Sequence, residues 1–208
     1  MRVLTLSVFA MCAATAAFAQ QWEFGAVAGG GFLNSVSASG GATAGFAPGL
    51  VAGALVGERL SSHISGEIRY EFFQSDLRLS SSGQTARFAG DAHAVHYDIL
   101  YRVRNTESRV QFYGAVGGGM KIFRGTGAEE AFQPLSQYGY FTKTQEVKPM
   151  ISAGGGVTFR LASKLMLRAE VRDFITPFPT QVLTPAPDVK FGSFLNDVVP
   201  MVALEYVH

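Results

Sequence analysis

The stretch HISGEIRYEF, residues 63–72, alternates between two kinds of side chain along its length. Successive side chains of a β-strand point to opposite faces, so isoleucine and aromatic residues share one face while Glu67, Arg69 and Glu71 share the other. In a water-soluble β-protein the apolar face forms the core. In a transmembrane β-barrel the apolar face meets lipid and the charged face lines the interior. The remainder of the chain decides between these two architectures.

The same alternation recurs in VHYDILYRV (95–103) and KLMLRAEVRDF (164–174). The charged faces of the three stretches together carry nine residues that we take as a candidate lumenal network: Glu67, Arg69, Glu71, His96, Asp98, Arg102, Arg168, Glu170 and Arg172. An unpaired charge inside a narrow barrel costs several kcal/mol, and a mixture of carboxylates and guanidiniums removes that cost by pairing. The order Glu-Arg-Glu in one stretch complements the order Arg-Glu-Arg in another. We therefore expect a plugged polar core rather than an open pore.

Strand patterns with turns between them occupy nearly all of the chain after residue 20. The expected strands are 21–33, 48–60, 63–79, 84–104, 109–124, 145–161, 164–175 and 196–207. Tight connections at 61–62, 105–108 and 162–163 alternate with longer ones, so one end of the sheet carries all the long loops. Short periplasmic turns and long extracellular loops are typical of a transmembrane barrel.

The position of the large aromatic residues favours the membrane architecture. In the first expected strand Trp22, Phe24 and Phe32 lie near the ends, with alanine and glycine between them. Rings at strand ends predict two interfacial girdles, whereas a soluble sandwich or lipocalin-like barrel would place its largest side chains at strand centres. Charged residues are 16% of the chain, below the quarter or so of a soluble domain. The sequence thus predicts an all-β fold, an eight-stranded antiparallel up-and-down transmembrane β-barrel.

Three expected strands contain a glycine triplet, at 29–31, 117–119 and 154–156. Glycine inside a strand weakens it and needs a reason. By alternation the outer two glycines of each triplet point inward, where we expect them to leave room for long side chains of the facing wall in a barrel barely wide enough to be filled. The middle glycines, Gly30, Gly118 and Gly155, point outward, and we expect Gly155→Ala to be nearly neutral.

Residues 1–19 have the features of a secretory signal peptide. Arg2 precedes an apolar run that ends in the small-residue site Ala17-Phe18-Ala19, which predicts cleavage before Gln20 and a barrel domain of 20–208. A membrane anchor is the alternative, but the run is short for one. The single cysteine, Cys12, lies in this segment, so the mature chain has no disulfide. The net charge of +1 gives no argument for nucleic acid as a partner.

Motifs for catalysis or metal binding are weak. In HAVH (93–96) the two histidines are three residues apart, on opposite sides of a strand, so they cannot hold one ion together. His96 and Asp98 share a face and can orient a general base, yet no nucleophile can be placed beside them. The glycine triplets lack the lysine of a phosphate-binding loop. We predict no catalytic residue, no metal site and no cofactor.

The hairpin GGGVTFRLASKLMLRAEVRDF (154–174), the signal peptide and the alternating strands resemble the small outer-membrane β-barrel domains of the OmpA/OmpX type. The hairpin pattern G-x-G-x-x-[FY]-x-[LI]-x-x-x-[LI]-x-[LI]-R-x-E is typical of that family. The resemblance implies an outer-membrane location, contact with outer-membrane lipid, and delivery by periplasmic chaperones and the barrel-assembly machinery. It is silent about activity. Members usually end in an aromatic residue, where this chain has His208.

For function we expect a structural or surface-recognition role, with the long loops available to an extracellular ligand. Loop residues 129–141 are rich in aromatics and 177–191 in proline, and exposed aromatics on loops are common recognition surfaces. The same rings can instead pack the loops on one another. The alternative function is that of a lipid-modifying outer-membrane enzyme or a narrow channel.

Overall fold

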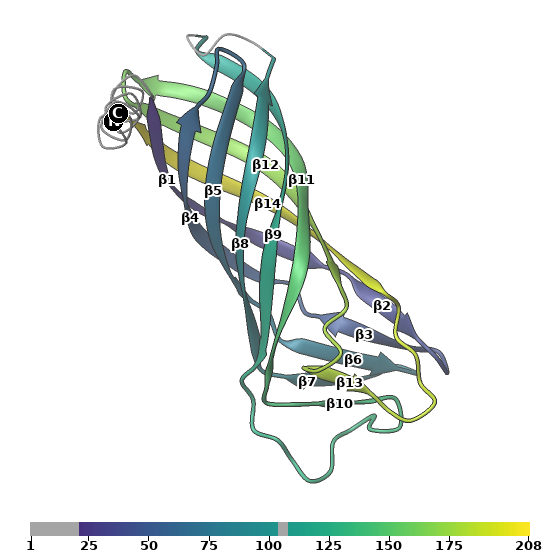
Figure 1. Cartoon of the computed structure of the whole chain (residues 1–208). Helices are drawn as coiled ribbons and strands as arrows, with labels where there is room; N and C mark the ends of the chain where they lie inside the picture. Colours follow the sequence, from purple (N-terminus) through teal and green to yellow (C-terminus); the bar gives the residue numbers. More distant parts are fainter. Residues whose placement is uncertain (1–20, 104–107) are drawn as a thin grey trace, which may run out of the picture.

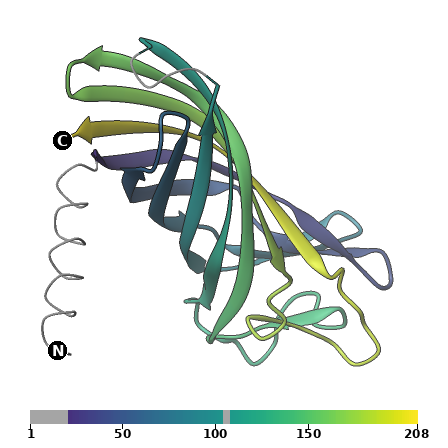
Figure 2. The ribbon, with the colours of Figure 1, turned by 45° about the horizontal axis from the view of Figure 1, so that its top comes forward.

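Eight antiparallel strands close into a barrel in the computed structural model, which describes residues 21–103 and 108–208 (Figure 1). Around the barrel they are β1 (Trp22–Leu33), β14 (Phe194–Val207), β12 (Leu165–Pro177), β11 (Gln145–Ala162), β9 (Val110–Gly125), β8 (Gly90–Arg102), β5 (Ile64–Gln74) and β4 (Gly49–Arg59). The first and last strands pair with each other, so the barrel has no free edge. Figure 2 shows the strands inclined around the barrel, as closure of a small barrel requires. The predicted eight-stranded antiparallel barrel is confirmed.

The expected signal peptide lies outside the described residues, as does most of the expected turn at 105–108. In the described ranges, no helix is long and apolar enough to cross a membrane.

Six short strands form a folded cap at the long-loop end of the barrel, at the bottom of Figure 1. The cap comprises residues 34–48, 75–89, 126–144 and 178–193. Its strands are β2 (Ser35–Ala38), β3 (Ala42–Phe46), β6 (Leu77–Ser81) and β7 (Gln84–Phe88), which form one sheet in the order β2-β3-β6-β7, and β10 (Gly139–Phe141) and β13 (Leu183–Pro185), which form a second. All long connections therefore do leave one end of the barrel, as the loop lengths predicted.

Two expected strand boundaries were wrong. The expected strands 63–79 and 84–104 are each divided, because the chain leaves the barrel after β5, forms the hairpin β6–β7 in the cap, and re-enters at β8. The period-two alternation continues across both breaks, since Leu77 and Leu79 face the cap core as Phe73 faces the barrel interior. Alternation reports only that one face is buried, so it cannot separate a barrel strand from a cap strand.

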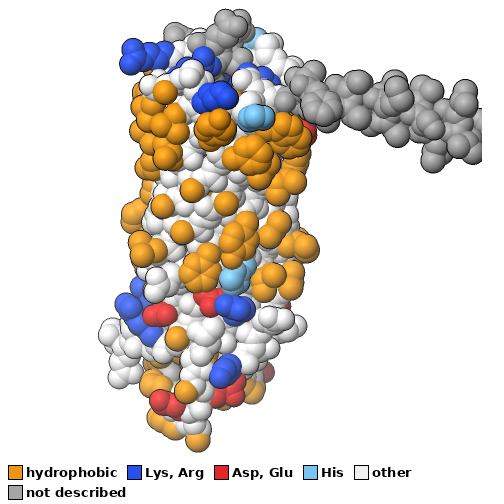
Figure 3. Space-filling model, turned by 90° about the vertical axis from the view of Figure 1, so that its left-hand side faces the viewer, with side chains coloured by type: hydrophobic (Ala, Val, Ile, Leu, Met, Phe, Trp, Pro, Cys, Tyr) orange, Lys and Arg blue, Asp and Glu red, His pale blue; other side chains and the backbone are white. Residues whose placement is uncertain are grey.

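The apolar face of the barrel strands points outward and the charged face points inward. Ile68 is 58% exposed, whereas its neighbours Glu67 and Arg69 are buried. On the face of the barrel shown in Figure 3, apolar side chains gather into two belts, with charged side chains mostly at the barrel ends and on the cap. Exposed rings lie at both ends of the strands, such as Tyr206 beside the short turns and Tyr70 toward the cap. This is the inverted arrangement of a membrane barrel.

The interior has two layers, although the alternation suggested a polar lumen throughout. Near the short turns most inward side chains are charged, with a small apolar cluster of Leu100, Tyr113 and Ala115 among them. Toward the cap they are apolar, and this layer is continuous with the core of the cap. Buried members of the continuous cluster include Val51, Phe73, Phe123, Phe174, Val199 and Met201 from the barrel and Phe46, Leu77, Phe88, Phe141, Val182 and Leu183 from the cap.

Candidate functional site

Opposite walls of the lumen meet through ion pairs between β5 and β12, which lie four strands apart around the barrel. Arg69 donates two hydrogen bonds to the Glu170 carboxylate, at 2.6 and 3.1 Å. Arg168 and Arg172 both donate to Glu67, each at 2.8 Å. The Glu-Arg-Glu order of β5 therefore faces the Arg-Glu-Arg order of β12. All five side chains are buried.

His96 joins this cluster between two carboxylates. Its Nε2 lies 2.8 Å from Glu71 Oε2 and its Nδ1 lies 3.0 Å from Asp98 Oδ1. Carboxylates only accept hydrogen bonds, so an imidazolium that donates from both nitrogens satisfies the geometry. Asp98 also accepts a hydrogen bond of 2.6 Å from Arg172. His93, the other histidine of HAVH, points outward and bonds Tyr70 at 2.8 Å.

Arg102 lies apart from the cluster, near the short turns. It donates two hydrogen bonds to Glu23, at 2.8 and 3.2 Å, and Arg59 at the rim approaches the same carboxylate at 3.3 Å. Arg168 lies between the two groups, because it donates to Glu67 and its Nη2 lies 4.0 Å from Glu23. Its Nε also forms an ion pair of 2.6 Å with Glu205. The nine charged residues singled out in the sequence thus line one lumen, with Glu23 and Glu205 completing their pairing.

Two polar contacts in the lumen were not anticipated. The Tyr113 hydroxyl donates to Glu170 at 2.6 Å, and Lys121 donates to Asp197 at 2.7 Å inside the apolar layer. The Lys121 ammonium also lies 3.8 Å from the centre of the Phe73 ring. Strand alternation places Asp197 on the same face as Glu205, so the signal for it was present.

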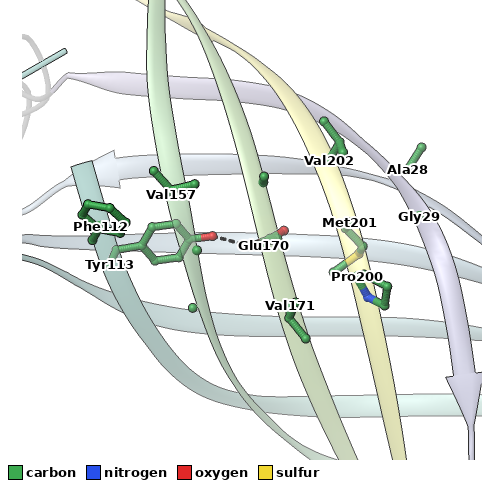
Figure 4. A pocket seen from close by; sticks show the side chains of 13 residues that line it. Ala28, Gly29, Phe112, Tyr113, Val157, Glu170, Val171, Pro200, Met201 and Val202 are labelled. Carbon is green, nitrogen blue, oxygen red and sulfur yellow. Dashed lines mark hydrogen bonds between the residues drawn. The ribbon is translucent and has the colours of Figure 1, made fainter. Parts of the chain in front are cut away.

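The inward glycines allow the neighbouring strand to approach closely, with both its backbone oxygens and its side chains. Gly156 of β11 stands in register between Tyr113 of β9 and Glu170 of β12, and the Tyr113 ring passes over it to reach Glu170 (Figure 4). A Cβ at Gly156 would collide with the Ala169 backbone oxygen and lie 2.8 Å from the Glu170 Cβ. One at Gly154 would collide with the Val171 backbone oxygen and lie 2.7 Å from Arg172 Cδ. We expected these glycines to leave room for long side chains of the opposite wall, and this was wrong: the groups that lie over them belong to the adjacent strands.

The same relation holds on β9, where Gly117 is in register with Asp98 and Gly119 with His96. A Cβ at Gly119 would lie 2.6 Å from the His96 Cβ, and one at Gly117 would collide with the Asp98 carboxylate. Each of these glycines is thus the neighbour of a charged or ionisable side chain that lies across it.

The middle glycines differ from one another. A Cβ at Gly30 would meet nothing within 4 Å, whereas one at Gly155 would lie 2.7 Å from the backbone oxygen of Tyr113. The expectation that Gly155→Ala is nearly neutral is therefore wrong, because a backbone oxygen cannot move aside as a flexible side chain can.

A groove of about 750 Å³ runs across the wall formed by β1, β14, β12, β11 and β9 (Figure 4). Small or apolar residues such as Ala28, Val171 and Pro200 line it. The polar side chains in its lining are Tyr113 and Glu170, which are bonded to each other. The groove is suited to contact with acyl chains rather than to chemistry. Within residues 21–103 and 108–208, no group of three or more His, Cys, Asp or Glu side chains is arranged to hold a metal ion.

The cap divides the loop aromatics into two sets. Phe141 is buried and Tyr138 packs against the core, so these rings hold the cap together. Phe132 is 80% exposed and Tyr140 is half-exposed. Beside them lies a cleft of about 270 Å³, lined by Thr85–Phe88 of β7 and by Ala128, Glu130, Gln133, Pro134 and Phe141. The cap therefore combines a rigid core with a hollowed, partly aromatic surface.

A closed eight-stranded barrel with a lipid-facing apolar surface and a charged interior defines an outer-membrane barrel. The chain belongs to the outer membrane protein beta-barrel domain family, whose model matches residues 4–195. It is accordingly located in the outer membrane. The family resemblance read from the 154–174 hairpin is confirmed.

Solved structures support the same fold. Neisserial surface protein A is similar with 10% identity and a TM-score of 0.57, over 89% of this chain and 96% of that one. The outer membrane protein OprG from Pseudomonas aeruginosa is similar with 12% identity and a TM-score of 0.53, over 91% of this chain and 95% of that one. At these identities the likeness concerns the fold alone. No curated protein matches the chain in sequence.

Proposed function

We propose that this protein is a sealed outer-membrane barrel that carries a surface-recognition cap, and that it neither conducts ions nor modifies lipid. The observation that supports this most directly is the filled lumen. Arg69, Glu71, Arg168 and Arg172 have no exposed surface, and each contacts a partner of opposite charge. Opening a path would separate buried ion pairs, at a cost of about 3–5 kcal/mol for each partner left alone.

The apolar layer adds a second barrier above the charged cluster. Phe73 and Phe174 lie edge to face with ring centres 5.6 Å apart, and the layer continues into the core of the cap. An ion entering from outside would have to cross this layer before it reached the charged cluster. The same layer fixes the cap on the barrel, which favours recognition by a preformed surface.

The test combines two measurements on the purified protein. Wild type in planar bilayers should show no conductance, and an open porin added to the same bilayers establishes that the assay detects a channel. Incubation with lipid A followed by mass spectrometry should leave every lipid mass as in protein-free liposomes. Steady conductance by wild type would establish the channel alternative, and a new lipid species would establish the enzyme alternative.

We also propose that residues 1–19 are removed on export and that periplasmic chaperones and the barrel-assembly machinery deliver the chain. Family membership and the lipid-facing alternation of Val202, Leu204 and Tyr206 in the last strand support this route. The mass of protein isolated from outer membranes should correspond to a start at Gln20. An unprocessed chain would contradict the cleavage site.

A further inference from the structure

The outer edge of β7 has backbone groups without partners. The hairpin β6–β7 turns through Ser82 and Gly83, which both have positive φ, so Ser81 and Gln84 form the first hydrogen-bonded pair. Pairs then alternate along the ladder, which leaves Thr85 and Arg87 with N–H and C=O groups directed away from β6. Within the described part of the chain, no backbone group hydrogen-bonds to these groups from the other side.

The opposite edge of the same sheet is covered by the chain itself. The Gly192 N–H donates to Ser37 O at 2.9 Å, and the Ser39 N–H donates to Lys190 O at 3.0 Å, so the segment around residue 191 lies along β2. Native sheets usually cover or block their edges. The β2 edge of this sheet is therefore covered, whereas the β7 edge is open and available to an added strand.

The open edge faces the cleft described above. The loop that begins at Thr126 is tied to the end of β7, because Thr126 and Gly127 donate to Ala89 O at 2.8 and 3.1 Å. Beyond this point the loop stands away from β7, and Gln133 is fixed by two hydrogen bonds with the Phe141 backbone, at 2.8 and 2.9 Å. The cleft of about 270 Å³ thus has one wall of free backbone groups and one wall held in place.

The side chains around the edge specify what would fit. The Phe88 and Phe141 rings are stacked, with centres 5.6 Å apart; both are largely buried in the cap core, and their accessible atoms form the apolar floor of the cleft. On the other face of the hairpin Arg87 lies opposite Arg78, and neither has a carboxylate partner in the described ranges. Like charges directly opposite each other are destabilising, and an acidic side chain placed between them would relieve the repulsion. Glu130 is the acidic side chain of the lining and stands on the opposite wall of the cleft, so carboxylates of an occupant are favoured on the Arg87 side and disfavoured beside Glu130.

We infer that the β7 edge is a docking site for an extended peptide segment in which acidic and apolar residues alternate. The segment pairs with the backbone of Thr85 and Arg87 as an added strand, places its apolar side chains on the Phe88–Phe141 floor, and presents its carboxylates to Arg87 and Arg78. A second copy of this chain is a poor occupant, since pairing two β7 edges would bring Arg87 close to its counterpart. The inference rests on the proposed recognition role and names its ligand class.

The probe is a capped, fluorescein-labelled peptide, Thr-Glu-Val-Glu-Val-Glu-Thr, titrated against the full barrel in nanodiscs and followed by fluorescence anisotropy. We expect saturable binding by wild type, and about tenfold weaker binding by Arg87→Glu. A peptide with lysine in place of glutamate should show the reverse preference between these two proteins. Lys190→Glu, a charge reversal on the covered side of the sheet, is the matched control and should bind as wild type does.

Backbone pairing is tested separately from charge. Two modified peptides are compared, one N-methylated at the glutamates and the other at the valines. One of the two should lose binding, because only one of these sets directs its N–H groups toward β7. Thr85→Pro should weaken binding about tenfold, since it removes an N–H outside the β6–β7 ladder, where proline is tolerated. Its folding is checked by heat-modifiable migration on gels, and Arg87→Glu decides the question if Thr85→Pro does not fold.

Three results would overturn the inference: no binding by wild type, equal binding by Lys190→Glu and Arg87→Glu, or binding that survives both patterns of N-methylation. None of them bears on conductance or lipid chemistry. If the peptide does not bind but the barrel neither conducts nor modifies lipid, only the peptide site is refuted. If the barrel conducts or modifies lipid, the proposed function is refuted.

Discussion

Gly154→Ala tests the account of the glycine triplets with a single methyl group. The new Cβ would lie 2.7 Å from Arg172 Cδ and 3.0 Å from Arg172 Cα, and would also collide with the Val171 backbone oxygen. Carbon atoms pack best at about 3.5–4.0 Å, so the side chain of Arg172 has to move by roughly 0.8 Å or more, and the collision with the Val171 oxygen requires the backbone of β12 to shift as well. Overpacking of this kind costs about 1–3 kcal/mol.

The displacement has a second cost, because Arg172 is held at three points. Its guanidinium donates to Asp98 at 2.6 Å, to Glu67 at 2.8 Å and to Glu170 at 3.0 Å. If the side chain is displaced far enough to lose these contacts, the buried carboxylates are left short of a cation and the loss rises toward about 3–5 kcal/mol. Urea unfolding of the barrel in liposomes, followed by tryptophan fluorescence and gel migration, measures the difference from wild type.

Gly30→Ala is the matched control, since it adds the same methyl group to another triplet where no atom lies within 4 Å. Its stability should equal that of wild type or exceed it by up to about 1 kcal/mol, through reduced freedom of the unfolded chain. Gly155→Ala should lose stability through its contact with the Tyr113 backbone oxygen while leaving the charged cluster intact. Equal losses at Gly30 and Gly154 would refute the steric account, because the triplets would then serve the backbone alone.

Three further tests probe the lipid face and the interior by the same unfolding assay. Ile68→Arg should cost about 2–4 kcal/mol, since Ile68 faces lipid, and Ile68→Ala should be mild; a fully stable Ile68→Arg barrel would reverse the orientation of β5. Lys121→Met should cost about 3–5 kcal/mol by leaving Asp197 unpaired, and adding Asp197→Leu should recover most of the loss; no recovery would contradict the pairing. Tyr113→Phe should cost about 1.5–3 kcal/mol through its bond to Glu170, and a change below a few tenths would show that this bond contributes nothing net.

The barrel was predictable because membrane insertion imposes one rule on every spanning strand. A stretch such as 63–72 must present apolar side chains to lipid and polar ones to the lumen, so alternation, loop lengths and end-placed rings all carry the same information. The charged ladders were predictable for the same reason, since Glu67 and Arg168 stand on inward positions of long, regular strands. Their complementary order also predicted a plugged polar core.

The cap and the finer contacts were less accessible for a different reason. Local alternation is identical in β5 and β6, so only the three-dimensional path reveals that the chain leaves the barrel between them. The contact of Tyr113 with Glu170 depends on which strands are neighbours and on the register at Gly156. Pairing register is a property of two strands together, so the alternation within one strand does not determine it.

The same layer of buried apolar side chains fills the part of the lumen nearest the cap and packs against the cap. Phe73 and Phe174 close the lumen above the charged cluster, and both belong to the cluster of buried side chains that reaches Leu77 and Phe88 in the cap. A variant that loosens this layer should therefore disturb the floor of the β7 cleft as well as the seal. The barrel interior is thus better understood as the foundation of an external surface than as a closed channel, because the side chains that exclude water from the lumen are continuous with those that shape the cap.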